Sequence, residues 1–197
     1  MKVAVIGTHY AGKSTLAARI VTGLKSLGHP ARLLPELARE CPYMLNECMT
    51  VNSQRWLWQQ QLNRETEEDL KLSRFTRPSI LVCDRSVLDP LIYADYMAHT
   101  TNGVEAAEYR AFVDARIQVA LEHFSTYDLV FWCRPAEDER DDPEDDGFRS
   151  IDPFFRKQVD QLFDLWIRRD SLAVIPAAEY AVDDVRNHYR MEVSDAS

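Results

Sequence analysis

The sequence predicts an α/β fold in which helices cover both faces of a parallel sheet. The first observation is that short apolar, largely β-branched runs alternate along the chain with longer segments of helical pattern. The second is a glycine-containing segment, residues 7–15, between the first apolar run and the first helical pattern. The 197 residues are 46% hydrophobic and 28% charged, which is enough for a full core. We therefore expect one domain over residues 1–197.

The first predicted strand, residues 3–6, leads into Gly7-Thr8-His9-Tyr10-Ala11-Gly12-Lys13-Ser14-Thr15, and a helix is predicted through Leu27. This segment has the pattern G-x-x-x-x-G-K-[ST]. The segment lies between a predicted strand and a predicted helix, and its glycines allow a tight turn. The backbone N–H groups of this turn and the positive end of the helix dipole then hold phosphate. Lys13 would add charge at the outer phosphates, and the Ser14 hydroxyl would ligate Mg²⁺. Residues 7–15 are therefore predicted to bind a nucleoside triphosphate.

A second strand is predicted at residues 31–34, followed by Glu36 and Arg39 where a helix is expected to start. The carboxyl ends of parallel strands line the ligand crevice of an open α/β sheet. Glu36 and Arg39 are therefore expected beside the phosphate loop if the first two strands are neighbours or near-neighbours. The alternative is that Glu36 only interacts with a helix dipole.

Residues 52–75 contain no glycine or proline and predict one long helix. Its apolar residues cluster early in the segment. They allow two interpretations, the floor of a substrate pocket or core packing, and we favour core packing. The cluster comprises Trp56, Leu57, Trp58 and Leu62.

The third predicted strand, residues 79–84, is apolar and ends in Asp84. Enzymes with this type of phosphate loop place the acid that holds Mg²⁺, usually through water, at the end of such a strand. Arg85 follows at the same crevice, where it could clamp a phosphate or orient the acceptor. Asp89 starts the next predicted helix.

The rest of the chain continues the alternation of helices and strands. We expect a helix at 103–124, a strand at 127–133, a helix at 154–169, a strand at 172–175 and a helix at 182–190, with a frayed tail from Met191.

Composition excludes several classes of protein. The net charge is −9, segment 137–146 contributes −7 of it, and the chain has no basic stripe, which argues against binding nucleic acid. No stretch reaches the roughly 20 apolar residues that span a bilayer, and no separate signal peptide precedes the first strand. Because no apolar span is found, no membrane partner is expected. Without a C-x-x-C pair, the cysteines indicate a reduced, cytoplasmic protein. They are Cys41, Cys48, Cys83 and Cys133.

Three further motifs accompany the loop at 7–15. They are Glu36-Leu37-Ala38-Arg39, Asp84-Arg85-Ser86 with Asp89, and Asp146-Gly147-Phe148-Arg149. Together they make the chain resemble the small P-loop kinases typified by the nicotinamide riboside kinase domain of the bifunctional bacterial NAD-biosynthesis protein. The chain resembles equally a set of ATPase-like domains grouped with that kinase.

This resemblance implies a three-layer P-loop NTPase sandwich of the nucleoside- and nucleotide-kinase type, with a five-stranded parallel sheet in the order 2-3-1-4-5. It also implies a lid at about 134–156 that carries arginines, here Arg134, Arg140, Arg149 and Arg156. A lid arginine would stabilise the transition-state charge and exclude water. Arg149 is the preferred catalytic arginine because it lies in the matched motif, and Arg134 is expected to contact the nucleotide. The acidic run at 137–146 indicates a solvated loop tip or a positively charged acceptor or partner.

The predicted function is an ATP- and Mg²⁺-dependent kinase that transfers the γ-phosphate to a small nucleoside- or nucleotide-like acceptor. Ser14 and Asp84 would hold the metal, and Lys13, Arg85 and Arg149 would neutralise phosphate charge. Glu36 is the candidate general base with Asp84 as the fallback, and Glu36, Arg39 and Arg85 are expected at the acceptor.

Two alternatives stay open. One is a nucleotide-dependent regulatory ATPase that acts on a protein partner, although the chain has no N-K-x-D guanine signature. The other is a kinase for a modified base or an end in nucleic acid, against which the acidic composition counts. A homo-oligomer is compatible with the sequence, which specifies neither the acceptor nor the oligomeric state.

Overall fold

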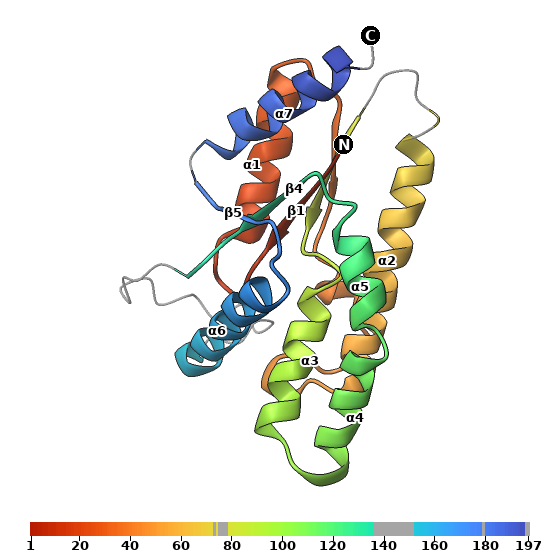
Figure 1. Cartoon of the computed structure of the whole chain (residues 1–197), viewed down its shortest axis with the longest axis vertical. Coiled ribbons are helices and arrows are strands. Elements are labelled where there is room, and N and C mark those ends of the chain that lie inside the picture. The colour runs from red at the N-terminus through yellow and green to blue at the C-terminus, as the bar shows by residue number, and fades with distance from the viewer. Residues whose placement is uncertain (73, 75–78, 136–151, 179, 196–197) are drawn as a thin grey trace.

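The computed structural model describes residues 1–72, 74, 79–135, 152–178 and 180–195. Its strands form one parallel sheet in the order β2-β3-β1-β4-β5 (Figure 1). This confirms the α/β class and the strand order implied by the resemblance. The elements are β1 (Lys2–Ile6), α1 (Lys13–Ser26), β2 (Ala31–Leu34), η1 (Ala38–Glu40), η2 (Asn46–Cys48), α2 (Val51–Leu72), β3 (Ile80–Asp84), α3 (Asp89–Thr100), α4 (Gly103–Asp114), α5 (Ile117–Phe124), β4 (Leu129–Trp132), α6 (Pro153–Arg169), β5 (Ile175–Pro176) and α7 (Ala181–Asp195).

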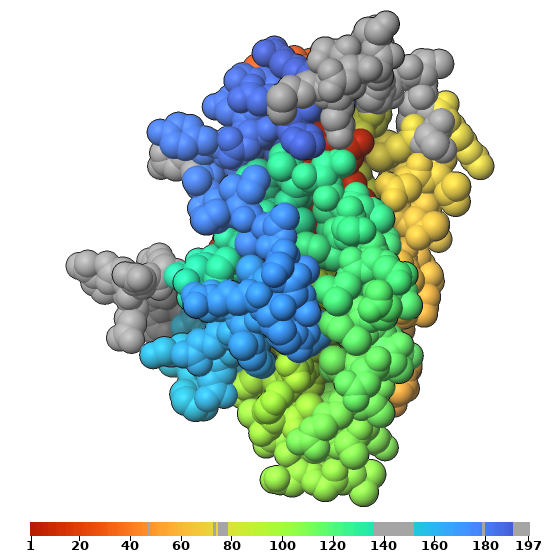
Figure 2. Space-filling view, in the orientation of Figure 1, coloured from red at the N-terminus to blue at the C-terminus, as the bar shows by residue number. Residues whose placement is uncertain are grey.

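The sheet separates two layers of helices. Successive side chains of a strand point to opposite faces, so Val3 and Val5 of β1 pack with α1 and α7, while Ala4 and Ile6 pack with α2 to α6. Figure 1 shows α1 and α7 lying together on their side of the sheet. In the space-filling view, α4 and α5 (green) and α6 (blue) form a nearly continuous surface on the other side (Figure 2). The predicted three-layer sandwich is confirmed.

The strand register brings the segments that follow β1, β2 and β3 together at one edge of the sheet. Val5 of β1 pairs with Asp84 of β3, and Leu34 of β2 pairs with Cys83. All three strands are parallel and end at nearly the same level, so the segments that follow them start side by side. This is why Glu36, two residues beyond β2, meets the chain that leaves β3.

One helix expected at residues 103–124 is two helices, α4 and α5. The helical geometry is interrupted at Arg116, whose backbone has φ −126° and ψ −16°. The guanidinium of Arg116 packs over the rings of Phe112 and Trp58, with its Cζ 4.6 Å and 5.3 Å from the ring centres. No glycine or proline lies at this break. The feature that accompanies it is the packing of Arg116 against Trp58 of α2.

Three smaller expectations also need correction. The last strand pairs with β4 only at Ile175 and Pro176, because Leu172 and Val174 pack instead against the core on the α2–α6 side. The last helix continues through Asp195, since no glycine or proline ends it at residue 190. The turn after Glu36 is a short 3₁₀ helix that begins at Ala38. Within the part of the chain that the structure describes, no helix is both long and apolar enough to cross a membrane.

Candidate active site

The phosphate loop connects β1 to α1 and depends on two glycines. Gly7 has φ +137°, and a Cβ at this position would lie 2.1 Å from the backbone oxygen of Cys133, at the end of β4. Gly12 has φ +76° and precedes the first residue of α1. The loop and the first turn of α1 surround a cavity of about 300 Å³, lined by residues 9–15 with Glu36 and Arg85. Backbone N–H groups at the start of a helix in such a cavity suit an anion.

Lys13 is the cation at the centre of this loop. Its side chain is buried, and Nζ donates a hydrogen bond to the backbone oxygen of Thr8 at 2.5 Å. Burial and, after it, the nearby Arg85 charge lower the pKa of Lys13, and against the opposing effect of carboxylates that include Glu36 and Asp84 the result is a pKa of about 8. A phosphate in the loop would supply the negative charge that restores a strongly basic amine.

Asp84, the last residue of β3, fits the expected magnesium acid. Its side chain is 3% exposed, and Oδ1 has no hydrogen-bond partner among the residues that the structure describes. Asp84 pairs in register with Val5, two residues before Gly7, so it lies at the same sheet edge as the loop that contains Ser14. A buried carboxylate oxygen without a partner is costly unless a ligand satisfies it. One carboxylate, one hydroxyl and substrate phosphates form a common magnesium site, so these residues fit the ion.

Glu36 and Arg85 form a half-buried ion pair beside the loop. The Arg85 Nε donates to Glu36 Oε1 at 2.5 Å, and its Nη1 lies 3.4 Å from Asp89 Oδ1. Burial alone would lower the pKa of Arg85, but these carboxylates outweigh it and raise this pKa well above its usual value. Burial raises the pKa of Asp89 against the opposing charge of Arg85. Asp89 also accepts hydrogen bonds from the backbone N–H and the hydroxyl of Ser86, which fixes the turn after β3.

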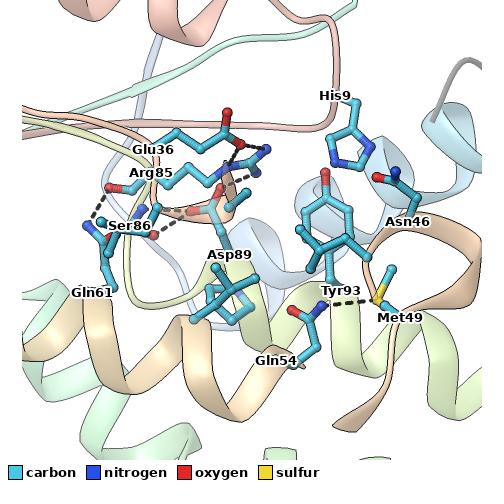
Figure 3. Close-up of a pocket in the computed structure, with 15 residues that line it drawn as sticks. His9, Glu36, Asn46, Met49, Gln54, Gln61, Arg85, Ser86, Asp89 and Tyr93 are labelled. Atoms are coloured by element: carbon cyan, nitrogen blue, oxygen red, sulfur yellow. Dashed lines mark hydrogen bonds and ion pairs between the residues drawn. The ribbon is translucent and has the colours of Figure 1, made fainter. Parts of the chain in front are cut away.

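A second, larger cavity of about 600 Å³ adjoins the loop cavity. Both cavities are lined by His9, Glu36 and Arg85. Figure 3 shows the Glu36–Arg85 pair on one side of the larger cavity and His9 with Tyr93 on the other. The other lining residues come from α2, α3, the segment between β2 and α2, and the turn between β3 and α3. They are Leu37, Ala38, Leu45, Asn46, Met49, Gln54, Leu57, Gln61, Ser86, Asp89 and Pro90.

The AAA domain family matches residues 2–185. The chain belongs to this family. The match covers β1, the phosphate loop and most of the elements described above. A comparison with curated proteins finds no match for this AAA domain.

Solved structures similar to this AAA domain include nucleoside and nucleotide kinases and the NadR protein. A deoxyadenosine kinase from M. mycoides with bound dCMP and dCDP has a TM-score of 0.62 at 17% identity, over 100% of this chain and 98% of that one. Thymidylate kinase from Candida albicans has a TM-score of 0.60 at 14% identity, over 99% and 91%. NadR in complex with NR has a TM-score of 0.65 at 17% identity over 95% of this chain, which spans only 51% of NadR. The predicted resemblance is confirmed, and at these identities it establishes the fold.

Two other predicted residues, Arg39 and Arg134, line neither cavity. Arg39 is exposed. Arg134 donates to Asp160 of α6 at 2.8 Å and packs over Trp132. Arg140, Arg149 and the acidic run 137–146 are outside the described residues.

Another arginine of the predicted lid approaches the loop. The guanidinium carbon of Arg156, in α6, lies 5.6 Å from the centre of the Tyr10 ring. In the apolar cluster of α2, Trp58 lies in the core, as favoured, whereas Leu57 lines the larger cavity.

The structure groups several residues in ways that the sequence did not predict, although His9 itself was predicted to bind the nucleotide. His9, Tyr93 and Phe155 form an aromatic group, with ring centres 5.1 Å apart for His9–Tyr93 and 5.7 Å for His9–Phe155. No local pattern in the sequence predicts this group, because its members come from three separate segments. By contrast, Gln54 and Gln61 are seven residues apart on α2 and therefore share one helix face. That spacing is a signal that could have identified them.

Proposed function

We propose that this AAA domain, over residues 1–197, is an ATP- and Mg²⁺-dependent kinase for a small nucleoside- or nucleotide-like acceptor. The observation that carries the proposal is that the phosphate-loop cavity and the larger cavity share His9, Glu36 and Arg85. A triphosphate bound along the loop would therefore end where the larger cavity begins. The likeness in fold to nucleoside and nucleotide kinases supports the same conclusion.

The lining of the larger cavity suits a nucleoside-like acceptor. It combines apolar side chains with a few polar groups, as small-molecule sites usually do. Apolar side chains such as Leu57 and Met49 can contact a flat ring, and the amides of Gln54 and Gln61 can hydrogen-bond to its edge. Glu36 and Arg85, at the junction with the loop, are placed to contact the hydroxyl that receives the phosphoryl group.

In the proposed reaction, the acceptor hydroxyl attacks the γ-phosphorus, and the bond to the β,γ-bridging oxygen breaks, with its electrons leaving on ADP. The hydroxyl proton passes to a Glu36 carboxylate oxygen, which lies beside the Arg85 guanidinium that pairs with this carboxylate. Lys13 and Arg85 stabilise charge on the phosphoryl oxygens. Mg²⁺, held by Ser14 and, through water, Asp84, would supply further charge neutralisation on the phosphates.

Closure over the phosphates is assigned to the predicted lid at about 134–156. Arg156 supports this assignment because its guanidinium already packs over Tyr10 of the loop. Arg149 stays a predicted catalytic arginine.

The test is an unbiased panel of nucleosides, nucleotides and vitamins with Mg-ATP. We expect ADP release that rises strongly with one acceptor class, and a product heavier by one phosphoryl group. ADP release that rises only with an added protein would favour the regulatory ATPase instead. Failure to bind any magnesium–nucleotide complex would overturn the kinase proposal.

Glu36→Gln should lower turnover by about 100-fold, the typical contribution of a general base, and should leave ATP affinity nearly unchanged. Steady-state kinetics and calorimetric titration with ATP measure the two effects separately. The matched control is Glu40→Gln, which removes an exposed carboxylate paired with Arg64. Unchanged turnover in Glu36→Gln would reduce Glu36 to a structural role.

Mg-ATP affinity should depend on pH through Lys13. The pKa of about 8 in the free protein means that the amine is charged below pH 8, and neutral above it. Bound phosphates favour the charged form, so above pH 8 binding must take up a proton. Between pH 7 and 9 the Kd should therefore rise by about tenfold. Calorimetry in buffers of different ionisation enthalpy measures this uptake, and a flat profile would contradict the assigned contact.

A further inference from the structure

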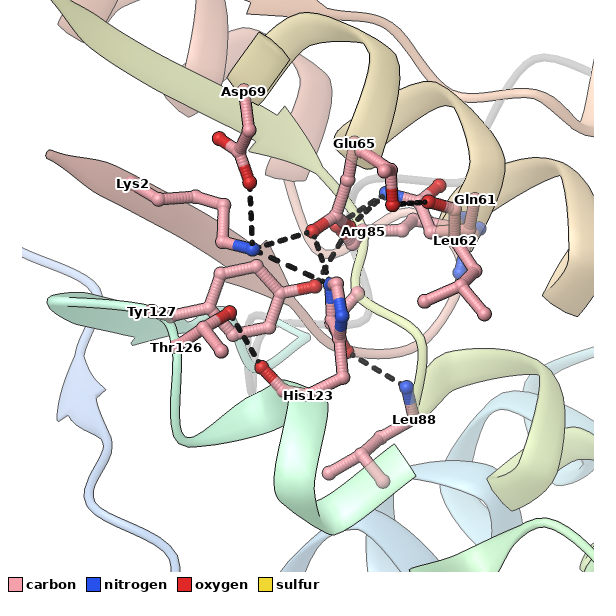
Figure 4. A network of polar contacts seen from close by, with 12 residues as sticks. Lys2, Gln61, Leu62, Glu65, Asp69, Arg85, Leu88, His123, Thr126 and Tyr127 are labelled. Atoms are coloured by element: carbon pink, nitrogen blue, oxygen red, sulfur yellow. Dashed lines mark hydrogen bonds and ion pairs between the residues drawn. The ribbon is translucent and has the colours of Figure 1, made fainter. Parts of the chain in front are cut away.

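A buried carboxylate outside both cavities contacts four hydrogen-bond donors. Glu65, on α2, is 0% exposed. Its Oε1 accepts hydrogen bonds from the Gln61 amide at 2.8 Å and the Tyr127 hydroxyl at 2.7 Å. Its Oε2 lies 2.8 Å from His123 Nε2 and 3.3 Å from Lys2 Nζ. Figure 4 shows the carboxylate surrounded by these four groups.

These donors keep Glu65 ionised. Burial alone would raise its pKa, but the hydrogen bond from His123 and the charge of Lys2, with the other donors, hold the pKa below the usual value. Both oxygens of Glu65 therefore act as acceptors only, which determines how its neighbours are oriented.

Gln61 is the neighbour that reaches the site. Its amide nitrogen has two hydrogens, one donated to Glu65 Oε1 and one to the Arg85 carbonyl at 3.2 Å. Because a carboxylate and a carbonyl can only accept, the amide cannot be turned around without losing both bonds. Glu65 thus selects the orientation in which Gln61 holds the Arg85 backbone.

The Arg85 backbone needs such support. It has φ +94°, a region that L-residues rarely occupy. Its N–H donates to the Val5 carbonyl at 3.0 Å, and Gln61 satisfies its carbonyl. From this backbone the side chain reaches Glu36 at 2.5 Å. A continuous chain of contacts therefore runs from Glu65 through Gln61 and Arg85 to Glu36.

We propose that Glu65 is a positioning residue that acts through Gln61 on the Arg85 backbone and so sets the geometry of the Glu36–Arg85 pair. Its effect on turnover rests on the proposed kinase function, whereas its effect on the geometry of Arg85 does not. Glu65 itself lines neither cavity.

Three variants test this role. Glu65→Met removes both acceptors and should lower kcat by at least about tenfold, because small displacements of reacting groups cost large factors in rate. Glu65→Gln keeps an acceptor oxygen for Gln61, since its NH₂ can face the His123 ring nitrogen, and should recover kcat to within about threefold of the parent. The matched control Tyr127→Phe deletes a hydrogen bond to the same Glu65 oxygen and should change kcat by less than about twofold. A folded Glu65→Met variant with parental kcat would overturn the proposal.

A measurement without ligand separates this proposal from the kinase proposal. The Nε–H of Arg85 should give a slowly exchanging ¹⁵N NMR resonance because it is bonded to Glu36. Glu65→Met should shift this resonance and speed its exchange, while Tyr127→Phe should preserve it. If the acceptor panel yields no transfer but the resonance responds in this way, the kinase proposal fails and the positioning role stands. An unmoved resonance in Glu65→Met would contradict the positioning role alone.

A double-mutant cycle covers the case in which Glu65→Met does not fold. Gln61→Met should lower kcat by at least about tenfold in the parent, but by less than about threefold in the Glu36→Gln background. Equal losses in both backgrounds would show that Gln61 acts independently of the Glu36–Arg85 pair and would overturn the proposal.

Discussion

Lys13→Ala is expected to abolish phosphoryl transfer while leaving the chain folded. The amine is buried in the loop, where the outer phosphates are predicted to bind, so no solvent cation can replace it. Loss of a preorganised charge that stabilises the transition state costs on the order of 10³-fold in turnover. Folding should persist, because the pKa of Lys13 is already lowered by burial, which shows that the charged amine is not favoured by the folded chain alone.

The measurement is single-turnover transfer with saturating Mg-ATP, together with the melting temperature. Arg19→Ala is the control, because it removes an exposed cation from the same helix, where the side chain donates to the carbonyl of Ala178. Full activity in Lys13→Ala would reject the assignment of the loop as a catalytic phosphate site.

Asp84→Asn should lower transfer by on the order of 10²-fold or more, because the magnesium ion supplies several kcal/mol of charge stabilisation. The loss should be accompanied by a much higher magnesium requirement. Stability should be unchanged or greater, since the substitution removes a buried carboxylate oxygen that has no partner among the described residues. Opposite effects on activity and stability would mark Asp84 as a residue retained for a ligand.

Magnesium titrations of activity and thermal unfolding measure these two effects. Asp95→Asn serves as the control: this carboxylate accepts a hydrogen bond from the Trp166 indole at 2.8 Å and lines neither cavity. A parental magnesium dependence in Asp84→Asn would remove Asp84 from the metal site and leave its burial unexplained.

Much of the candidate site could be predicted from the sequence, because many of its residues follow the ends of strands. The loop at 7–15, Glu36, Asp84 and Arg85 are each adjacent to a strand in the chain, and the parallel register carries them to one edge of the sheet. Arg39 also follows β2, but at a distance of five residues and within the short 3₁₀ helix, and its side chain is exposed. Adjacency to a strand predicts the neighbourhood of a residue but not the direction of its side chain.

Local pattern thus determined the α/β class, the phosphate loop and the order of the elements, since periodicity and glycine spacing act over a few residues. It did not determine where the helix at 103–124 breaks, which three aromatic rings gather at His9, or that Glu65 is buried. Residues 64–69 are uniformly polar in sequence, but His123 of α5 and Tyr127, which follows α5, enclose Glu65. Those features depend on contacts between residues far apart in the chain, 58 and 62 positions for Glu65, and such contacts exist only once the layers have packed together.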